Sequence, residues 1–201
     1  MDYIDKVFYI NLDKRTDRKE FILREFETLG IPEEKIERFS AIYHKMGCYG
    51  CGQSHLSVLK LARDRKYKNI LIFEDDFQLL VDKDTFWKHI SHVFEKNIPY
   101  DVVMPSYNSS EEYPFDEFLS YTRNCQTASC YMVSGNFVEK LIENLEEGLP
   151  HLLSTEMHWV YTNDQYWKRL QTGNWFICTT RLGKQRSGFS DLAREYVDYN
   201  V

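Results

Sequence analysis

The sequence lacks the features that would direct the chain into or across a membrane. No apolar run approaches the ~20 residues that a membrane-spanning helix needs. The first six residues, MDYIDK, have neither the basic start nor the apolar stretch of a signal peptide. We therefore expect a protein of a reducing, cytoplasmic compartment that has no transmembrane segment of its own and is at most peripheral to a membrane.

The sequence also lacks a disulfide framework and an excess of basic charge. It shows no sign of a boundary between domains. Five cysteines, an odd number without regular spacing, fit free thiols better than paired ones. The 25 basic residues against 31 acidic ones give a net charge of −6, which argues against binding nucleic acid by charge. We find no internal repeat, low-complexity tract or linker, so residues 1–201 are expected to form one globular domain.

The chain is organised around residues 70–76, whose sequence is ILIFEDD. Four large apolar residues in succession predict a strand buried on both faces, and three acids follow it. Carboxylates at a buried strand end repel one another and lose hydration, so they are tolerated chiefly where a cation, a helix N-terminus or a ligand neutralises them. In an open α/β sheet that place is the ligand crevice at the carboxyl ends of the strands. A solvated acidic turn is the alternative.

Strand-like and helix-like segments alternate along the chain. Buried or β-branched runs predict strands over residues 6–12, 36–42, 70–73, 100–104, 128–133 and 175–178. Apolar residues at helical spacing predict helices over residues 16–29, 56–62, 82–94, 136–147 and 164–170. Polar or glycine-rich loops are expected over residues 46–55, 105–124 and 183–191. This alternation favours an α/β fold with a mostly parallel sheet that helices cover on both faces.

The acidic triplet suits a hard divalent cation, since Mg²⁺ and Mn²⁺ prefer oxygen ligands and commonly take one or two carboxylates together with phosphate oxygens. Such a metal would neutralise the charge of a diphosphate leaving group. If strand geometry continues through the acids, Glu74 and Asp76 point to one face and Asp75 to the other. Glu74 and Asp76 are then the expected working pair.

Two other clusters suggest different chemistry. Cys48 and Cys51 form a Cys-x-x-Cys pair before a helix, as in thiol redox proteins, although the pair falls at the wrong place in the chain for a thioredoxin-like fold. A zinc site that includes Cys125 and Cys130 is a further alternative. Ser54 and His55 are adjacent and would diverge on a helix, so we expect them to bind backbone or a ligand phosphate rather than to form a nucleophile pair.

Three motifs, in their order and spacing, resemble glycosyltransferase family 25. They are residues 9–18 (YINLDKRTDR), 50–55 (GCGQSH) and 70–76, and weaker similarity extends to residues 127–134, 163–167 and 183–191. That family includes lipopolysaccharide and procollagen galactosyltransferases, with relatives in large DNA viruses, and the late segments look most like the viral and collagen-modifying branch. A viral source would place the protein in host cytoplasm.

The resemblance implies a GT-A-like nucleotide-binding sandwich and an inverting, Mn²⁺- or Mg²⁺-dependent transfer of a sugar, most often galactose from UDP-galactose. The acceptor would be a hydroxyl of a glycan, a lipid-linked molecule or a protein. An inverting transfer needs a carboxylate that deprotonates this acceptor hydroxyl. Asp164, which opens a predicted helix beside Tyr166 and Trp167, is the candidate base, and an acid favoured by the helix dipole is the alternative.

The resemblance also implies a donor site. It makes Glu74 and Asp76 the acids that hold donor and metal, with Asp75 beside them. It sets Asn11, Arg18, Ser54 and His55 at the nucleotide end of the crevice, and it brings Lys184, Arg186 and Asp191 over the diphosphate or its metal. A catalytically inactive nucleotide-sugar-binding module and a thiol redox protein that uses Cys48 and Cys51 are the alternative functions.

Overall fold

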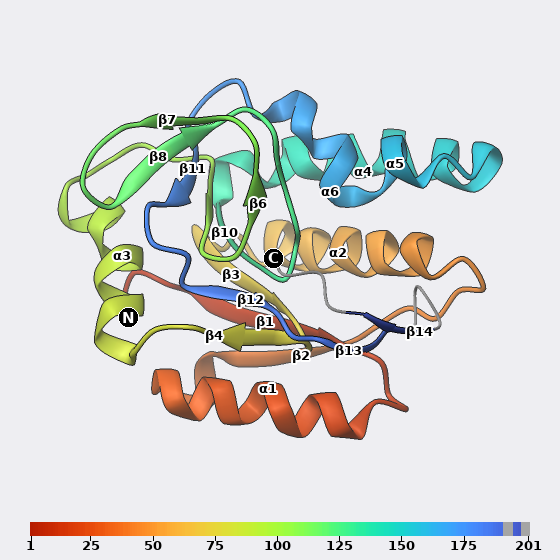
Figure 1. The fold of residues 1–201 in the computed structure, drawn as a ribbon, viewed down its shortest axis with the longest axis horizontal. Helices are drawn as coiled ribbons and strands as arrows, with labels where there is room; N and C mark the ends of the chain where they lie inside the picture. The colour runs from red at the N-terminus through yellow and green to blue at the C-terminus, as the bar shows by residue number, and fades with distance from the viewer. Residues whose placement is uncertain (191–194, 198–201) are drawn as a thin grey trace.

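The computed structural model describes residues 1–190 and 195–197. Its centre is an eight-stranded sheet in the order β2-β1-β3-β10-β5-β11-β8-β7 (Figure 1). The strands in this order are Ile36–Ser40, Lys6–Asn11, Asn69–Glu74, Cys130–Ser134, Val102–Met104, Trp175–Cys178, Leu119–Thr122 and Glu112–Pro114. The pairing of neighbouring strands shows that β10 and β8 run opposite to the other six strands. Those six strands all point the same way, so most strands of the sheet share one direction.

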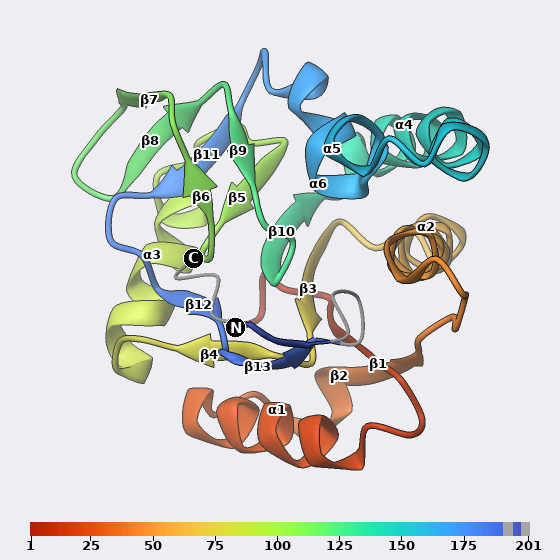
Figure 2. The same ribbon diagram turned by 45° about the vertical axis from the view of Figure 1, so that its right-hand side comes forward.

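Helices cover both faces of the sheet. Helices α1 (Thr16–Leu29) and α3 (Lys83–Glu95) lie on one face, and α2 (Gly47–Asp64) and α4 (Gly135–Thr155) lie together on the other (Figures 1 and 2). Alternate residues of the central strands supply the two cores. In β3, Ile70 and Ile72 join the core under α2 and α4, while Leu71 and Phe73 join the core under α1 and α3. The predicted α/β sandwich, buried on both faces, is confirmed.

Shorter elements surround this framework. The 3-10 helix η1 spans Glu33–Lys35, and α5 (His158–Tyr161), α6 (Asn163–Tyr166) and the 3-10 helix η2 (Trp167–Leu170) follow α4. Three two-stranded ribbons pair β4 (Phe77–Leu79) with β12 (Gly183–Gln185), β6 (Asn108–Ser109) with β9 (Cys125–Gln126), and β13 (Gly188–Ser190) with β14 (Glu195–Val197). The β4–β12 ribbon brings residues near the end of the described chain beside the acidic end of β3.

Three predicted loops contain regular structure. Residues 105–124 hold β6, β7 and β8, and residues 183–190 hold β12 and β13. These strands are two to four residues long, too short for an alternating pattern to be read from the sequence. The glycine-rich segment 46–55 is almost wholly the first part of α2, which therefore begins nine residues before the predicted start at residue 56.

The glycines of this segment serve close packing rather than a loop. A Cβ atom at Gly50 would fall well inside contact distance of the carbonyl oxygen of Ile42, and one at Gly52 would overlap the Leu149 side chain of α4. The lack of a side chain thus lets α2 approach the chain after β2 on one side and α4 on the other. Glycines are typical of loops, so the sequence predicts a loop here. The neighbours that require glycine at these two helical positions become visible only in the structure.

All five cysteines are free, as predicted. Within residues 1–190 and 195–197, no helix combines the length and apolar character needed to cross a membrane.

Candidate functional site

A cavity of about 310 Å³ opens at the carboxyl ends of β1 and β3, beside the segment that follows β2. This is the edge of the sheet where the sequence predicted a ligand crevice. Acids from the end of β3 line the cavity together with basic and aromatic residues. The lining includes Lys14, Arg15, Arg18, Tyr43, His44, Lys45, Cys51, Ser54, Glu74, Asp75, Asp76 and Gln185.

Arg18, near the start of α1, bridges two of the three acids. Its Nη1 atom donates to Asp75 Oδ1 at 3.0 Å and to Asp76 Oδ2 at 2.9 Å. Asn11, at the end of β1 and 1% exposed, donates through Nδ2 to Asp75 Oδ2 at 2.7 Å. Asn11 therefore lies behind Asp75 and positions it, rather than lining the cavity itself.

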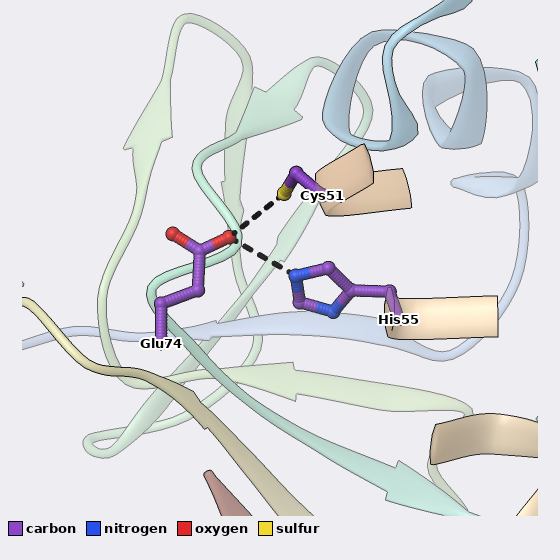
Figure 3. Close-up of side chains that lie close together, drawn as sticks. All are labelled: Cys51, His55 and Glu74. Carbon is purple, nitrogen blue, oxygen red and sulfur yellow. Dashed lines mark hydrogen bonds and ion pairs between the residues drawn. The ribbon is translucent and has the colours of Figure 1, made fainter. Parts of the chain in front are cut away.

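Glu74 turns to the other face of the sheet, toward α2 (Figure 3). Its Oε1 atom lies 3.0 Å from Nε2 of His55 and accepts a hydrogen bond from the Cys51 thiol at 3.4 Å. The other nitrogen of His55, Nδ1, lies 2.8 Å from the Tyr131 hydroxyl on β10. The second carboxylate oxygen of Glu74 points away from both α2 side chains in Figure 3. One oxygen of Glu74 is thus anchored, while the residue as a whole lines the cavity.

The expectation that Glu74 and Asp76 share a face is wrong. Strand β3 ends at Glu74, and Asp75 and Asp76 form a turn, so the alternation of a strand does not extend to Asp76. Asp75 and Asp76 instead share Arg18, and Glu74 pairs with His55. All three acids nevertheless line the same cavity.

The acids differ in their electrostatics. Burial by itself would raise the pKa of Glu74, but the hydrogen bond from His55 and its positive charge when protonated outweigh burial, so this pKa is lowered. Burial raises the pKa of Asp75 in spite of the charge of Arg18 and the hydrogen bond from Asn11. Burial and the negative charge of Glu74 raise the pKa of Asp76 to about 7.

Asp76 has an oxygen whose hydrogen-bonding capacity is not used. Its Oδ2 accepts from Arg18 and from Gln185 Nε2 at 3.1 Å, but its buried Oδ1 has no hydrogen-bond partner in the described part of the chain. A buried carboxylate oxygen without a partner is costly in free energy, and a bound cation or a ligand hydroxyl would satisfy it. The residues present therefore fit a hard divalent cation at Asp76.

The cavity lining also carries positive charge and an aromatic ring. Lys14 and Arg15 lie in the loop between β1 and α1, and the Lys14 Nζ atom lies 5.6 Å from the centre of the Tyr43 ring. Tyr43 is 72% exposed. The segment that carries it is tied to α2 by Ser54, whose hydroxyl accepts from the Ile42 N–H and donates to the Gly50 carbonyl, each at 2.8 Å. Ser54 thus bonds backbone, one of the two roles expected for it.

The remaining predicted site residues lie around this cavity or outside the described chain. The Asp164 carboxylate, on α6, accepts from the Thr127 N–H at 3.2 Å and from the Thr162 hydroxyl at 3.0 Å, and it does not line the cavity. Lys184 lies on β12 outside the lining, and the Arg186 guanidinium lies 4.2 Å from the centre of the Phe21 ring. Asp191 lies outside the described residues.

Sequence reasoning missed Gln185, which reaches Asp76 from β12. It follows Lys184, a predicted site residue, on β12, and neighbouring residues of a strand point to opposite faces. Recognising residues 183–185 as a strand would have been the signal. Lys14, Arg15 and Tyr43 were also missed, although the first two lie inside the motif at residues 9–18.

No protein-family model matches the chain, and no curated protein matches it significantly. Solved structures do resemble its fold. A mannose-1-phosphate geranyltransferase from Thermus thermophilus matches with a TM-score of 0.51 and 8% identity over 92% of this chain and 74% of that one. A197 from STIV matches with a TM-score of 0.52 and 14% identity over 96% and 93% of the two chains. A glycosyltransferase involved in the glycosylation of the major capsid of PBCV-1 has a TM-score of 0.49 and 10% identity over 86% and 80%. The fold is thus a GT-A-like α/β sandwich.

Proposed function

We propose that the protein is a metal-dependent glycosyltransferase that moves a sugar from a nucleotide-sugar donor to a hydroxyl of an acceptor. The observation that carries this proposal is that one cavity is lined both by three acids, Glu74, Asp75 and Asp76, and by basic residues that include Lys14, Arg15 and Lys45. A nucleoside diphosphate sugar needs both charges, because basic groups attract the diphosphate and carboxylates hold a metal and the sugar hydroxyls. The GT-A-like fold, which the chain shares with a mannose-1-phosphate geranyltransferase, is compatible with the same conclusion.

The more specific assignment is a UDP-sugar donor, most often UDP-galactose, with transfer of family 25 type. It rests on the similarity of residues 9–18, 50–55 and 70–76 to that family. Asp76 and the unanchored oxygen of Glu74 are the groups that would hold Mn²⁺ or Mg²⁺, with Asp191 as a further candidate ligand. When bound, the metal would neutralise negative charge that develops on the leaving diphosphate. Arg18 would hold Asp75 and Asp76 in place, and Lys184 and Arg186 are proposed to approach the diphosphate from the β12 side.

The acceptor is a glycan, lipid-linked or protein hydroxyl, and Asp164 is the proposed base that takes its proton. Burial raises the pKa of Asp164, which makes this carboxylate a stronger base than an exposed aspartate. Its two hydrogen bonds, from Thr127 and Thr162, fix the orientation of the carboxylate. This role requires the acceptor to reach α6 from the cavity.

The test is a donor screen that measures UDP release across a panel of UDP-sugars, with Mn²⁺, Mg²⁺ or a chelator present. We expect turnover with one UDP-hexose, loss of turnover in the chelator, and loss in Asp76→Ala. Asp84→Ala, which removes an exposed carboxylate from α3, is the matched control. Equal activity of Asp76→Ala and the unchanged protein would refute the metal role of Asp76.

Two alternative functions predict different results, which separate assays would detect. A nucleotide-sugar-binding module without catalysis would show UDP-dependent thermal stabilisation that needs the metal, but neither hydrolysis nor transfer. A thiol redox protein would reduce insulin through Cys48 and Cys51. Burial raises the pKa of both thiols, whereas redox-active cysteines of such pairs have a lowered pKa. The observed environment therefore disfavours redox chemistry.

A further inference from the structure

Cys51, His55 and Glu74 form a cluster with the composition of a transition-metal site. Their ligand atoms, Sγ, a ring nitrogen and a carboxylate oxygen, all lie within 4.8 Å of one another. The cluster combines two side chains one turn apart on α2 with a third from the end of β3 (Figure 3). It is the one group of three such residues found among residues 1–190 and 195–197, and it includes neither Asp75 nor Asp76.

The spacing of these atoms is close to that of three corners of a tetrahedral site. Zn–S bonds of about 2.3 Å and Zn–N or Zn–O bonds of about 2.0–2.1 Å place neighbouring ligand atoms roughly 3.3–3.5 Å apart. The distance from Cys51 Sγ to Glu74 Oε1 is 3.4 Å, and that from His55 Nε2 to the same oxygen is 3.0 Å. A metal among the three would require movements of only a few tenths of an ångström along these two edges.

The surroundings support the histidine as a ligand. His55 is 1% exposed, and its Nδ1 atom lies 2.8 Å from the Tyr131 hydroxyl. With Nε2 on a metal, Nδ1–H would donate to the Tyr131 oxygen, which is the arrangement that fixes the ring of most metal-bound histidines. Cys51 and Glu74 also line the cavity, so the fourth coordination position would face it.

We propose that Cys51, His55 and Glu74 bind a zinc ion. A thiolate ligand selects Zn²⁺ over the hard cations Mg²⁺ and Mn²⁺, which prefer all-oxygen sites. On binding, the Cys51 S–H bond breaks, its proton passes to solvent, and the sulfur forms the Zn–S bond. The thiolate and the Glu74 carboxylate together balance the two positive charges of the ion. This site uses the Glu74 oxygen that lies near His55 and Cys51, whereas the proposed hard-cation position uses Asp76 and the other oxygen of Glu74. Zinc binding does not depend on the proposed transfer reaction.

The test uses the reduced, untagged full chain, stripped of metal with a chelator that is then removed. Zn²⁺ is titrated in competition with a chromophoric chelator, and Co²⁺ is added separately as a spectroscopic probe. We expect one zinc per chain and, with Co²⁺, a thiolate-to-metal charge-transfer band in the near ultraviolet. Cys51→Ser should remove the band and weaken zinc binding at least 100-fold. Cys48→Ser, which changes a cysteine three residues away on the same helix, should bind as the unchanged protein does.

Several outcomes would overturn the proposal. They are no zinc bound at equimolar concentration, zinc binding that Cys51→Ser leaves unchanged, and a cobalt spectrum without thiolate character. If Cys51→Ser does not fold, zinc-edge X-ray absorption of the unchanged protein decides the question, because the site requires one sulfur and a nitrogen in the ligand shell. An all-oxygen shell would refute it. Asp76→Asn should keep the zinc site, whereas it should lose any metal-dependent transfer, so the two proposals fail separately.

Discussion

The Nη1 atom of Arg18 lies 2.9 Å from Oδ2 of Asp76, although the two residues are 58 positions apart in the sequence. Arg18 comes from the start of α1, and Asp76 follows β3. Because β1 and β3 are parallel neighbours, the loop after β1 and the turn after β3 meet at one edge of the sheet. This ion pair supplies positive charge to an acidic cluster that would otherwise repel itself.

Replacing Arg18 should destabilise the protein in a pH-dependent way. Arg18→Met leaves Asp75 and Asp76 buried without their cation, which we expect to cost about 3 kcal/mol of the free energy of unfolding at pH 8. At pH 5 the loss should be smaller, because carboxyls whose pKa is raised become protonated. Denaturant unfolding at both pH values measures this difference. Arg24→Met, an exposed change on the same helix, is the control, and an equal loss in both variants would contradict the ion-pair argument.

Asp76 should make the metal-free protein less stable as the pH rises. Its pKa is about 7 in the folded protein against an ordinary value of 3.8, so between these values the folded state holds a proton that the unfolded state has released. Stability therefore falls from about pH 4 to about pH 7, by a few kcal/mol, since one pKa unit corresponds to ~1.4 kcal/mol. Asp76→Asn should flatten this part of the curve in thermal unfolding with a chelator present. Saturating Mn²⁺ should likewise reduce the fall in stability of the unchanged protein between about pH 4 and about pH 7. The prediction would be contradicted if, without metal, Asp76→Asn and the unchanged protein lost stability equally over this pH range.

Gly50 should resist the substitution that helix propensity favours. Alanine is better than glycine inside a helix by about 1 kcal/mol, yet the new Cβ would meet the backbone carbonyl of Ile42. We expect Gly50→Ala to lower the free energy of unfolding by about 2 kcal/mol and to weaken UDP binding, because residues 41–45 line the cavity. Gly188→Ala, where a Cβ has no neighbour within 4 Å among the described residues, is the control. An increase in stability for Gly50→Ala would refute the packing argument.

Asp164 should affect turnover without affecting donor binding. Asp164→Asn keeps the size of the side chain and can still accept a hydrogen bond from the Thr127 N–H, but it cannot take a proton from an acceptor. We expect kcat to fall by roughly 10²-fold or more with an unchanged Kd for UDP, measured by acceptor-dependent product formation and by calorimetry. Near-normal turnover would exclude Asp164 as the base. Glu74→Gln would then be the next variant to measure, because one oxygen of Glu74 is anchored by His55 while the residue lines the cavity.

The local patterns of the chain predicted most of its framework. The buried run at residues 70–73, the β-branched run at residues 6–12 and the helical spacing at residues 16–29 all correspond to elements of the structure. Burial on both faces of a strand and on one stripe of a helix leaves a period that is visible in consecutive residues. The place of the acids, at the carboxyl edge of the sheet, followed from the same patterns.

The sequence by itself determined that three acids end a buried strand of an α/β sheet, because periodicity and charge are properties of neighbouring residues. It did not determine which groups those acids meet. The partners of Glu74 are His55 and Cys51, from a helix whose glycines predict a loop, and those of Asp76 are Arg18 and Gln185. Only the tertiary structure decided this division, since the turn after Glu74 and the packing of α2 against α4 depend on contacts between residues far apart in the chain.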